Sequence, residues 1–456
     1  MATRVRWAWP GWVAAVAAAC VASASQGSTP DQLYGLIGLT LINFCLIAWV
    51  ALDDAFESLK TSQVLITAIA LGAMGLLTQP LLEDDHFRYL WDGFITASAG
   101  NPFAHAPSHY FTDASVPLAM QDALNGINNP DIPTIYGPVL QAVFALCFWM
   151  APAALWPLKL VLLAALIAVV LLLHSAGVSA RWLMVLVLHP LMVKESAMTA
   201  HPDILLGAAL LGAVLAWQRS HHGIAAGLAA IAVAMKFSAA PALLFLCVNR
   251  DGRLSVRGCL AMAFVLSVVY APVLLAIPGT AVTGVTGESA FALQWTFNPL
   301  MFKFAAVALG DAAARLACVA LFALAWLAMA ARWTVRLRAL ALVVPTGTDA
   351  RDAGGFVMPF SPPSPPLAGV FVALLLLSPA VNPWYWLWVL PLALLPFSPV
   401  VWVAATVSLF SFAHVATQVL AVSSIITYAV PPWATGLQLT AIACALGFAH
   451  HRSKRT

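Results

Sequence analysis

Runs of about 20 mostly apolar residues, each long enough to cross a lipid bilayer as a helix, recur along almost the whole chain. A backbone inside a bilayer has no water to bond, so such runs are expected to be helices. A hydrophobic fraction of 62% with only 9% charged residues excludes an ordinary soluble domain. The sequence predicts an all-α fold, a polytopic transmembrane helical bundle of about 12–14 spans, several of them short or broken by proline. The expected spans are residues 7–25, 33–52, 61–82, 138–151, 157–174, 182–199, 203–217, 223–247, 258–277, 311–331, 366–380, 384–397, 399–421 and 433–449.

The positions of the basic residues indicate which ends of the spans face the cytoplasm, where lysine and arginine are enriched. Basic residues flank apolar runs near residues 4–6, in 332–351 and in the tail at 451–455. These three regions are therefore predicted to be cytoplasmic. Three expected spans precede residue 83, which places the polar stretch 83–138 on the extracytoplasmic side.

One proline- and glycine-rich stretch, residues 345–369, cannot pack a core or continue a helix. It is predicted to be a cytoplasmic linker between an N-terminal transmembrane bundle, residues 1–344, and C-terminal transmembrane helices, residues 370–456. The span count puts the polar island 194–203 inside, unless 182–217 forms a re-entrant pair. The net charge of +3 is too small to indicate a nucleic-acid partner.

The stretch 83–138 is the one long polar segment of the chain and begins with a cluster of ionisable residues. Such residues are costly to hold at a membrane boundary, which favours a functional role. Adjacent carboxylates raise each other's pKa unless a cation lies near, and Asp85 or Asp84 is placed to take a proton from an alcohol as a general base. Arg88 and His86 can supply the positive charge. The alternative is an acidic cap, or a salt bridge to Arg88 that only orders the loop.

Helical spacing puts Asp85, Arg88, Tyr89 and Asp92 on one face. This spacing predicts an amphipathic helix on the membrane surface, with its polar face towards a cavity and Trp91 in the aromatic belt. The alternative is an interfacial anchor. Further along, prolines fix the backbone around Tyr136, which either contacts a sugar or phosphate or merely lies between two segments.

Three polar sites inside apolar runs complete the candidates for substrate binding. Lys236 is expected in the middle of a span, where a lysine costs about 2.5–3.5 kcal/mol. It should therefore face a partner or an anionic ligand such as a lipid phosphate, and the alternative is that it snorkels to the surface. His201 and Asp203 belong to the charged island 194–203, for which the alternative is a structural role that includes a simple pair of Lys194 and Glu195. Asn382 and Tyr385 lie in the aromatic segment SPAVNPWYW, for which an aromatic belt is the alternative.

No glycine-rich phosphate loop or H-E-x-x-H motif is present, which argues against a nucleotide-driven pump and a zinc protease. Glu83, Asp84 and His86 are close enough in sequence for a divalent ion. Basic residues alone can stabilise an anionic group in a site, so we expect neither a metal nor another cofactor.

The blocks DDHFRYLWDGF, AGNPFAHAP, IPTIYGPVLQAVF, HPDILLGAALL, MKFSAAPALL, QWTFNPL and LSPAVNPWYWLWVLP resemble the GT-C superfamily of membrane glycosyltransferases. The resemblance is greatest to the bacterial polyprenol-phosphate-mannose-dependent mannosyltransferases. It implies a protein of the bacterial inner membrane that acts on the periplasmic or exterior face. There it would transfer a hexose, expected to be mannose, with inversion from a polyprenyl-phosphate sugar to a hydroxyl of a glycan, glycolipid or other acceptor. The family's essential carboxylate in a D-x-x-x-Y context corresponds to Asp85, with Tyr89.

Two other functions remain open from the sequence. A transporter or flippase of a lipid-linked or small anionic solute would use the same charges and broken helices. A non-catalytic assembly subunit would leave the aspartate pair unexplained. The expected partners are thus the sugar donor, the hydroxyl acceptor and membrane lipid.

Overall fold

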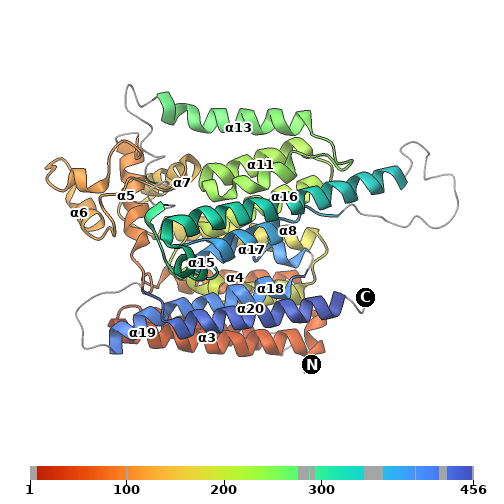
Figure 1. Ribbon diagram of the computed structural model, residues 1–456. Coiled ribbons are helices and arrows are strands. Elements are labelled where there is room, and N and C mark those ends of the chain that lie inside the picture. The colour runs from red at the N-terminus through yellow and green to blue at the C-terminus, as the bar shows by residue number, and fades with distance from the viewer. Residues whose placement is uncertain are drawn as a thin grey trace.

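The structure is a computed structural model that describes residues 8–98, 101–275, 287, 293–343, 363–395, 397–420 and 429–453. The described residues form helices and hold no strand, which confirms the predicted all-α class. Most of the predicted linker lies outside the described residues. In Figure 1 most helices run side by side, with α5 and α6 at one end and both chain termini at the other.

The first half of the chain forms the helices that surround the polar stretch. Apolar side chains on α2 and α3 pack against each other, and α4 packs on both α2 and α8. The charged helix α5 packs on α7, while α6 covers its outer side. The bounds are α2 Ala8–Ala24, α3 Thr29–Leu52, η1 Asp54–Ser58, α4 Thr61–Leu76, α5 Asp85–Ser98, η2 Pro107–Tyr110, α6 Leu118–Asn125, α7 Pro138–Met150, α8 Trp156–Ser175 and α9 Ala180–Val187.

The second half contains several interrupted helices. α10 packs on α11, which packs on α13, and the short helix η5 lies against α10. The bounds are η3 Met192–Met198, α10 Asp203–Gln218, α11 His222–Met235, η4 Phe237–Ala242, α12 Leu243–Leu246, α13 Val256–Leu275, α15 Phe302–Leu309, α16 Asp311–Val343, α17 Leu367–Leu377, η5 Pro383–Trp388, η6 Leu392–Leu394, α18 Pro399–Val407, η7 Ser408–Phe412, α19 Ala413–Leu420 and α20 Pro432–Ser453.

Six described helices are long and apolar enough to cross a membrane, and the bent pair of η3 and α10 would make a seventh. This confirms a polytopic protein, although many expected spans are shorter apolar helices such as α4, α7, α11 and α17. α15, with 8 residues, is too short to cross a membrane.

Several expected spans are interrupted, and three of them are interrupted beside polar residues. The span expected at 61–82 ends at Leu76, and the Lys159 ammonium donates to the carbonyls of Gly75 and Thr78 at this end, at 2.8 and 2.5 Å. The span expected at 223–247 stops at Met235, directly before Lys236. The one expected at 384–397 is only short 3-10 turns, which follow Pro383.

Candidate active site

A cavity of about 450 Å³ lies between the start of α5, the segment after α6 and the helix η5. We call it the polar cavity. It brings together side chains that are distant in sequence, so the broken helices create a site that no single segment contains. The predicted site residues that line it are Asp84, Asp85, Arg88, Tyr136, Lys236, Asn382 and Tyr385.

The two aspartates at the start of α5 share one amide partner. Asn128 donates from Nδ2 to Asp84 Oδ1 at 2.5 Å and lies 3.4 Å from Asp85 Oδ1. Burial raises the pKa of both carboxyl groups, and the negative charge of Glu83 adds to the effect. The Asp85 side chain keeps 24% of its surface exposed. Asp85 is therefore a carboxylate of raised basicity that an acceptor in the cavity can reach.

Neither of the two predicted counter-charges forms a salt bridge with the aspartates, and of the two only Arg88 lines the cavity. Its guanidinium donates to the carbonyls of Ile132 at 3.0 Å and Asn129 at 3.1 Å, and no described acid forms a salt bridge with it. His86 is not a cavity residue: its ring stacks on Phe87, and burial lowers its pKa to about 4. Its position outside the cavity and its lowered pKa argue against the predicted role as a cationic substrate ligand.

Two other residues of α5 serve the packing rather than the cavity. Asp92 accepts from Thr134 Oγ1 at 2.5 Å and from Gln141 Nε2 at 2.9 Å, and it is buried away from the cavity. The Tyr89 hydroxyl bonds to His201 Nδ1 at 2.8 Å, also behind the cavity wall. The polar face of α5 thus meets the cavity only at its first turn. Trp91 is buried against α6 instead of lying in an aromatic belt.

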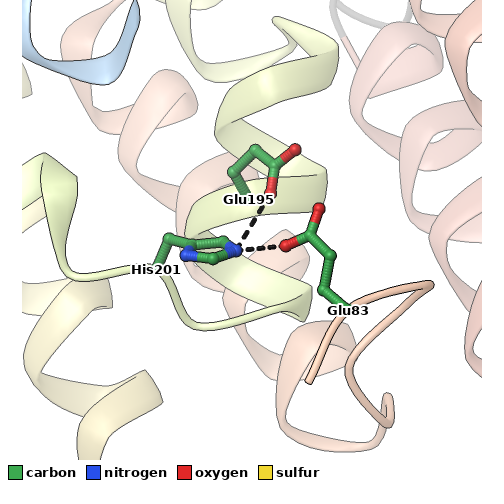
Figure 2. Close-up of side chains that lie close together, drawn as sticks. All are labelled: Glu83, Glu195 and His201. Atoms are coloured by element: carbon green, nitrogen blue, oxygen red, sulfur yellow. Dashed lines mark hydrogen bonds and ion pairs between the residues drawn. The ribbon is translucent and has the colours of Figure 1, made fainter. Parts of the chain in front are cut away.

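The charged island between η3 and α10 meets the start of the polar stretch. The two helices are bent by 111°, which supports the re-entrant alternative and brings the island to the side of residue 83, against the simple span count. Figure 2 shows Glu83 and Glu195 directed towards His201. Glu83 contacts His201 Nε2, whereas the nearest Glu195 oxygen lies 3.6 Å from that nitrogen.

Backbone geometry shows that this contact is costly to form. Leu82 and Ala200, the residues before Glu83 and His201, have φ angles of 59° and 67°. A non-glycine residue in this left-handed region costs about 1–3 kcal/mol and persists where the surroundings impose it. Such strain is typical of functional sites.

Glu83, Glu195 and His201 also form the group of described residues whose ligand atoms lie within 4.8 Å of one another. The consecutive trio considered from the sequence does not converge, because Asp84 turns to Asn128 and His86 to Phe87. The ammonium of Lys194 already contacts both glutamates.

Lys236 lies on the other side of the cavity, at the break after α11. It is paired with a carboxylate of another helix, because its Nζ lies 2.7 Å from Oδ1 of Asp203 in α10. That oxygen also accepts from Trp388 Nε1 at 2.5 Å. The ammonium lies 5.0 Å from the ring centre of Tyr385. Asp203 and His201 are buried and do not line the cavity, so they hold other residues in place.

The turn around Tyr136 is held against the end of α11. Gly137 donates its N–H to the carbonyl of Met235 at 2.9 Å, and a side chain at Gly137 would overlap the backbone of Ala234. The close approach places the Tyr136 ring 5.6 Å from the Lys236 ammonium. Tyr136 therefore contributes to the cavity wall and does more than separate two segments.

A second cavity of about 350 Å³ shares Ile135, Lys236 and Tyr385 with the first. We call it the apolar groove. Its remaining wall is mostly apolar, with leucines of α17 and aromatic and aliphatic residues of α16. An ammonium thus stands between a polar cavity and a hydrophobic groove, an arrangement that fits an anionic head group joined to an apolar chain.

Comparison with known proteins places this site in a family. Residues 6–250 match the family model described as alpha-(1->6)-mannopyranosyltransferase, N-terminal domain. The chain belongs to this mannosyltransferase family. The matched half of this mannosyltransferase contains Asp85, Arg88 and Lys236, whereas Asn382 and Tyr385 lie beyond it. No curated protein and no solved structure matched the chain.

Asn128, Lys194 and Trp384 belong to the site but were not among the predicted site residues. Trp384 lines the cavity and stacks on the His201 ring at 3.8 Å. The available signals were weak: an asparagine pair in the polar stretch, and a lysine–glutamate pair in an apolar run. Neither signal indicates which distant residues these side chains contact.

Proposed function

We propose that this mannosyltransferase transfers mannose, with inversion, from a polyprenyl-phosphate donor to an acceptor hydroxyl on the extracytoplasmic face. The observation that carries the donor assignment is the position of Lys236, shared by the polar cavity and the apolar groove. A lipid-linked sugar phosphate has the matching parts: a sugar, an anionic phosphate and a hydrocarbon chain. A donor linked to a nucleotide would leave the groove without a role.

The proposed reaction is a direct displacement at the anomeric carbon. Asp85 takes the proton of the acceptor hydroxyl while the oxygen of that hydroxyl attacks the anomeric carbon. The bond between this carbon and the donor phosphate oxygen breaks, and its electron pair stays on the phosphate oxygen. The polyprenyl phosphate leaves as an anion. Lys236 and Arg88 are the cations that line the cavity, and they would stabilise the developing charge. The family description suggests a hydroxyl at carbon 6 of mannose as the acceptor.

A transporter or flippase for a lipid-linked solute is the alternative. The family match supports the transferase, and so does the reachable carboxylate Asp85. A transport function would use Lys236 to bind the anionic solute, but it would need no general base and so leaves Asp85 without a role.

A donor panel tests the proposal. The purified full-length protein is incubated with an α-mannoside acceptor and polyprenyl-phosphate mannose, the corresponding glucose donor, or a nucleotide-linked mannose. We expect mannosylated acceptor and free polyprenyl phosphate in equal amounts from the first donor alone. Transfer only from the nucleotide-linked sugar, or donor translocation in vesicles without transfer, would contradict it.

The proposed orientation predicts which end of the bundle is accessible from outside. The polar stretch carries α6, whereas α20 ends at the opposite side of the bundle with the chain termini (Figure 1). In a cysteine-free background, Asn125→Cys, at an exposed position, should react with a membrane-impermeant thiol reagent in intact cells. Ser108→Cys in the same stretch should do so more slowly, because it is half-buried.

His451→Cys, at an exposed position near the end of α20, is the matched control and should react only after lysis. The reverse pattern would place the site in the cytoplasm and remove the basis for a lipid-linked donor.

A further inference from the structure

The cluster of Glu83, Glu195 and His201 has ligand types and spacing that would suit a divalent cation (Figure 2). The chain itself places a positive charge there. The Lys194 ammonium contacts Glu83 Oε1 and lies 3.0 Å from Glu195 Oε2, and it also lies 4.1 Å from the ring centre of Phe412. Its side chain has no exposed surface.

We propose that Lys194 is a positioning residue, whose buried ammonium replaces a metal ion in this cluster and thereby fixes Asp85 at the polar cavity. The proposal rests on the proposed function, because it assigns Lys194 a part in keeping the base ready. Lys194 does not line the cavity and so acts through other residues.

The first link from Lys194 to Asp85 runs through Glu83. Both carboxylate oxygens of Glu83 are held, one by Lys194 and the other by His201. Glu83 stands two residues before Asp85, at the point where α5 begins. Fixing this side chain therefore helps to hold the first turn of α5, together with the contacts of Asn128 and Arg88.

The second link runs through His201. Its Nδ1 bonds to the Tyr89 hydroxyl at 2.8 Å and lies 3.9 Å from Asp85 Oδ2. Tyr89 is one helical turn after Asp85, so the cluster holds α5 on both sides of the base. The stack of His201 on Trp384 further restricts the ring.

The π-helix η3 explains how two charges reach the same place. Successive residues of an α-helix point in directions about 100° apart, yet Lys194 and Glu195 meet in one cluster. The wider η3 turn closes with bonds from Thr199 N to the Lys194 carbonyl and from His201 N to the Glu195 carbonyl, both 2.8 Å. Such π-turns are frequent at functional sites.

Electrostatics gives Lys194 a second effect on Asp85. Without the ammonium, the charge of Glu83 is no longer balanced and opposes ionisation of the base. The charged and titratable groups around Asp85 are Glu83, Asp84, Tyr89, Tyr136, His201 and Tyr385. Removing Lys194 should therefore move the acid limb of the pH–rate profile to higher pH.

The test compares Lys194→Met, Glu83→Gln and the double variant in the full-length protein. Lys194→Met should lower kcat about 100-fold, the size of effect expected from a misplaced catalytic group, with little change in donor KM. The acid limb of its pH–rate profile should move to higher pH. The double variant should recover part of the lost thermal stability and part of kcat, because it leaves no unpaired charge on Glu83, whereas Glu195 still lacks the ammonium.

Lys159→Met is the matched control, because Lys159 is also a buried lysine but bonds only to backbone carbonyls. It should lower thermal stability and leave the acid limb where it is. A kcat of Lys194→Met within twofold of the wild type would overturn the proposal. Strictly additive effects of Lys194→Met and Glu83→Gln on thermal stability and kcat would overturn it as well.

Metal analysis provides an independent outcome. We expect no stoichiometric divalent ion in the purified protein and full activity after treatment with a chelator. A bound ion at one per chain would mean that Lys194 does not replace a metal, and would overturn the proposal. If the wild type transfers no sugar, the proposed function fails. The energetic coupling of Lys194 to Glu83 in thermal unfolding then tests by itself whether Lys194 holds this cluster together.

Discussion

Replacing Asp85 by asparagine should lower kcat by about two to four orders of magnitude, the range that general acid–base catalysis contributes. Asparagine keeps the shape of the side chain and its contact with Asn128, but it cannot accept a proton. The protein should insert and unfold like the wild type. Turnover is measured as mannose transfer from the lipid-linked donor with a saturating acceptor.

Two variants make this result specific. Asp122→Asn, the same change at an exposed position of α6, should leave turnover unchanged. Asp84→Asn should have a smaller effect than Asp85→Asn, because Asp84 is held more closely by Asn128. Near-normal turnover of a folded Asp85→Asn protein would reject Asp85 as the base and make Asp84 the candidate.

The pH dependence of the wild type follows from the same carboxyl group. The base must be ionised to act, and burial raises the pKa of Asp85. Activity should therefore fall as the pH decreases through a value above the usual range of an aspartate. An acid limb at or below that usual range would mean that another group titrates.

The helical class and the polar stretch could be predicted because hydropathy reports local properties of the chain. Apolar runs mark helices whatever they pack against, and a charged segment among them stands out. The same reasoning placed Asp85 and Arg88 at the cavity, because both lie in the first turn of one helix.

The parts that sequence reasoning missed depend on contacts between distant segments. Lys236 was expected in the middle of a span, but α11 ends just before it, where Asp203 of α10 balances its charge. His201 was assigned to the substrate, yet it lies behind the cavity wall. Neither partner can be identified from spacing along the chain, because the bend between η3 and α10 creates the meeting point.

The pairing of Lys236 with Asp203 changes how the role of this lysine must be tested. Replacing Lys236 by methionine removes the cation, but it also leaves the Asp203 carboxylate buried without its charged partner. Loss of one member of such a pair costs about 2–5 kcal/mol. The donor phosphate would also lose a charged partner, at a cost in the same range, so Lys236→Met should weaken donor binding by roughly 30-fold or more. This variant alone does not separate lost donor binding from lost stability.

The double variant Lys236→Met/Asp203→Asn separates the two effects. It removes the unpaired carboxylate while Trp388 keeps a hydrogen-bond acceptor on residue 203, so thermal stability should return. If Lys236 holds the donor phosphate, donor binding should stay weak, because no cation remains between the polar cavity and the apolar groove. Asp203→Asn alone should keep that cation and bind donor far better than either variant without Lys236. Donor binding that recovers together with stability in the double variant would show that the lysine only balances Asp203, and the phosphate would then depend on Arg88.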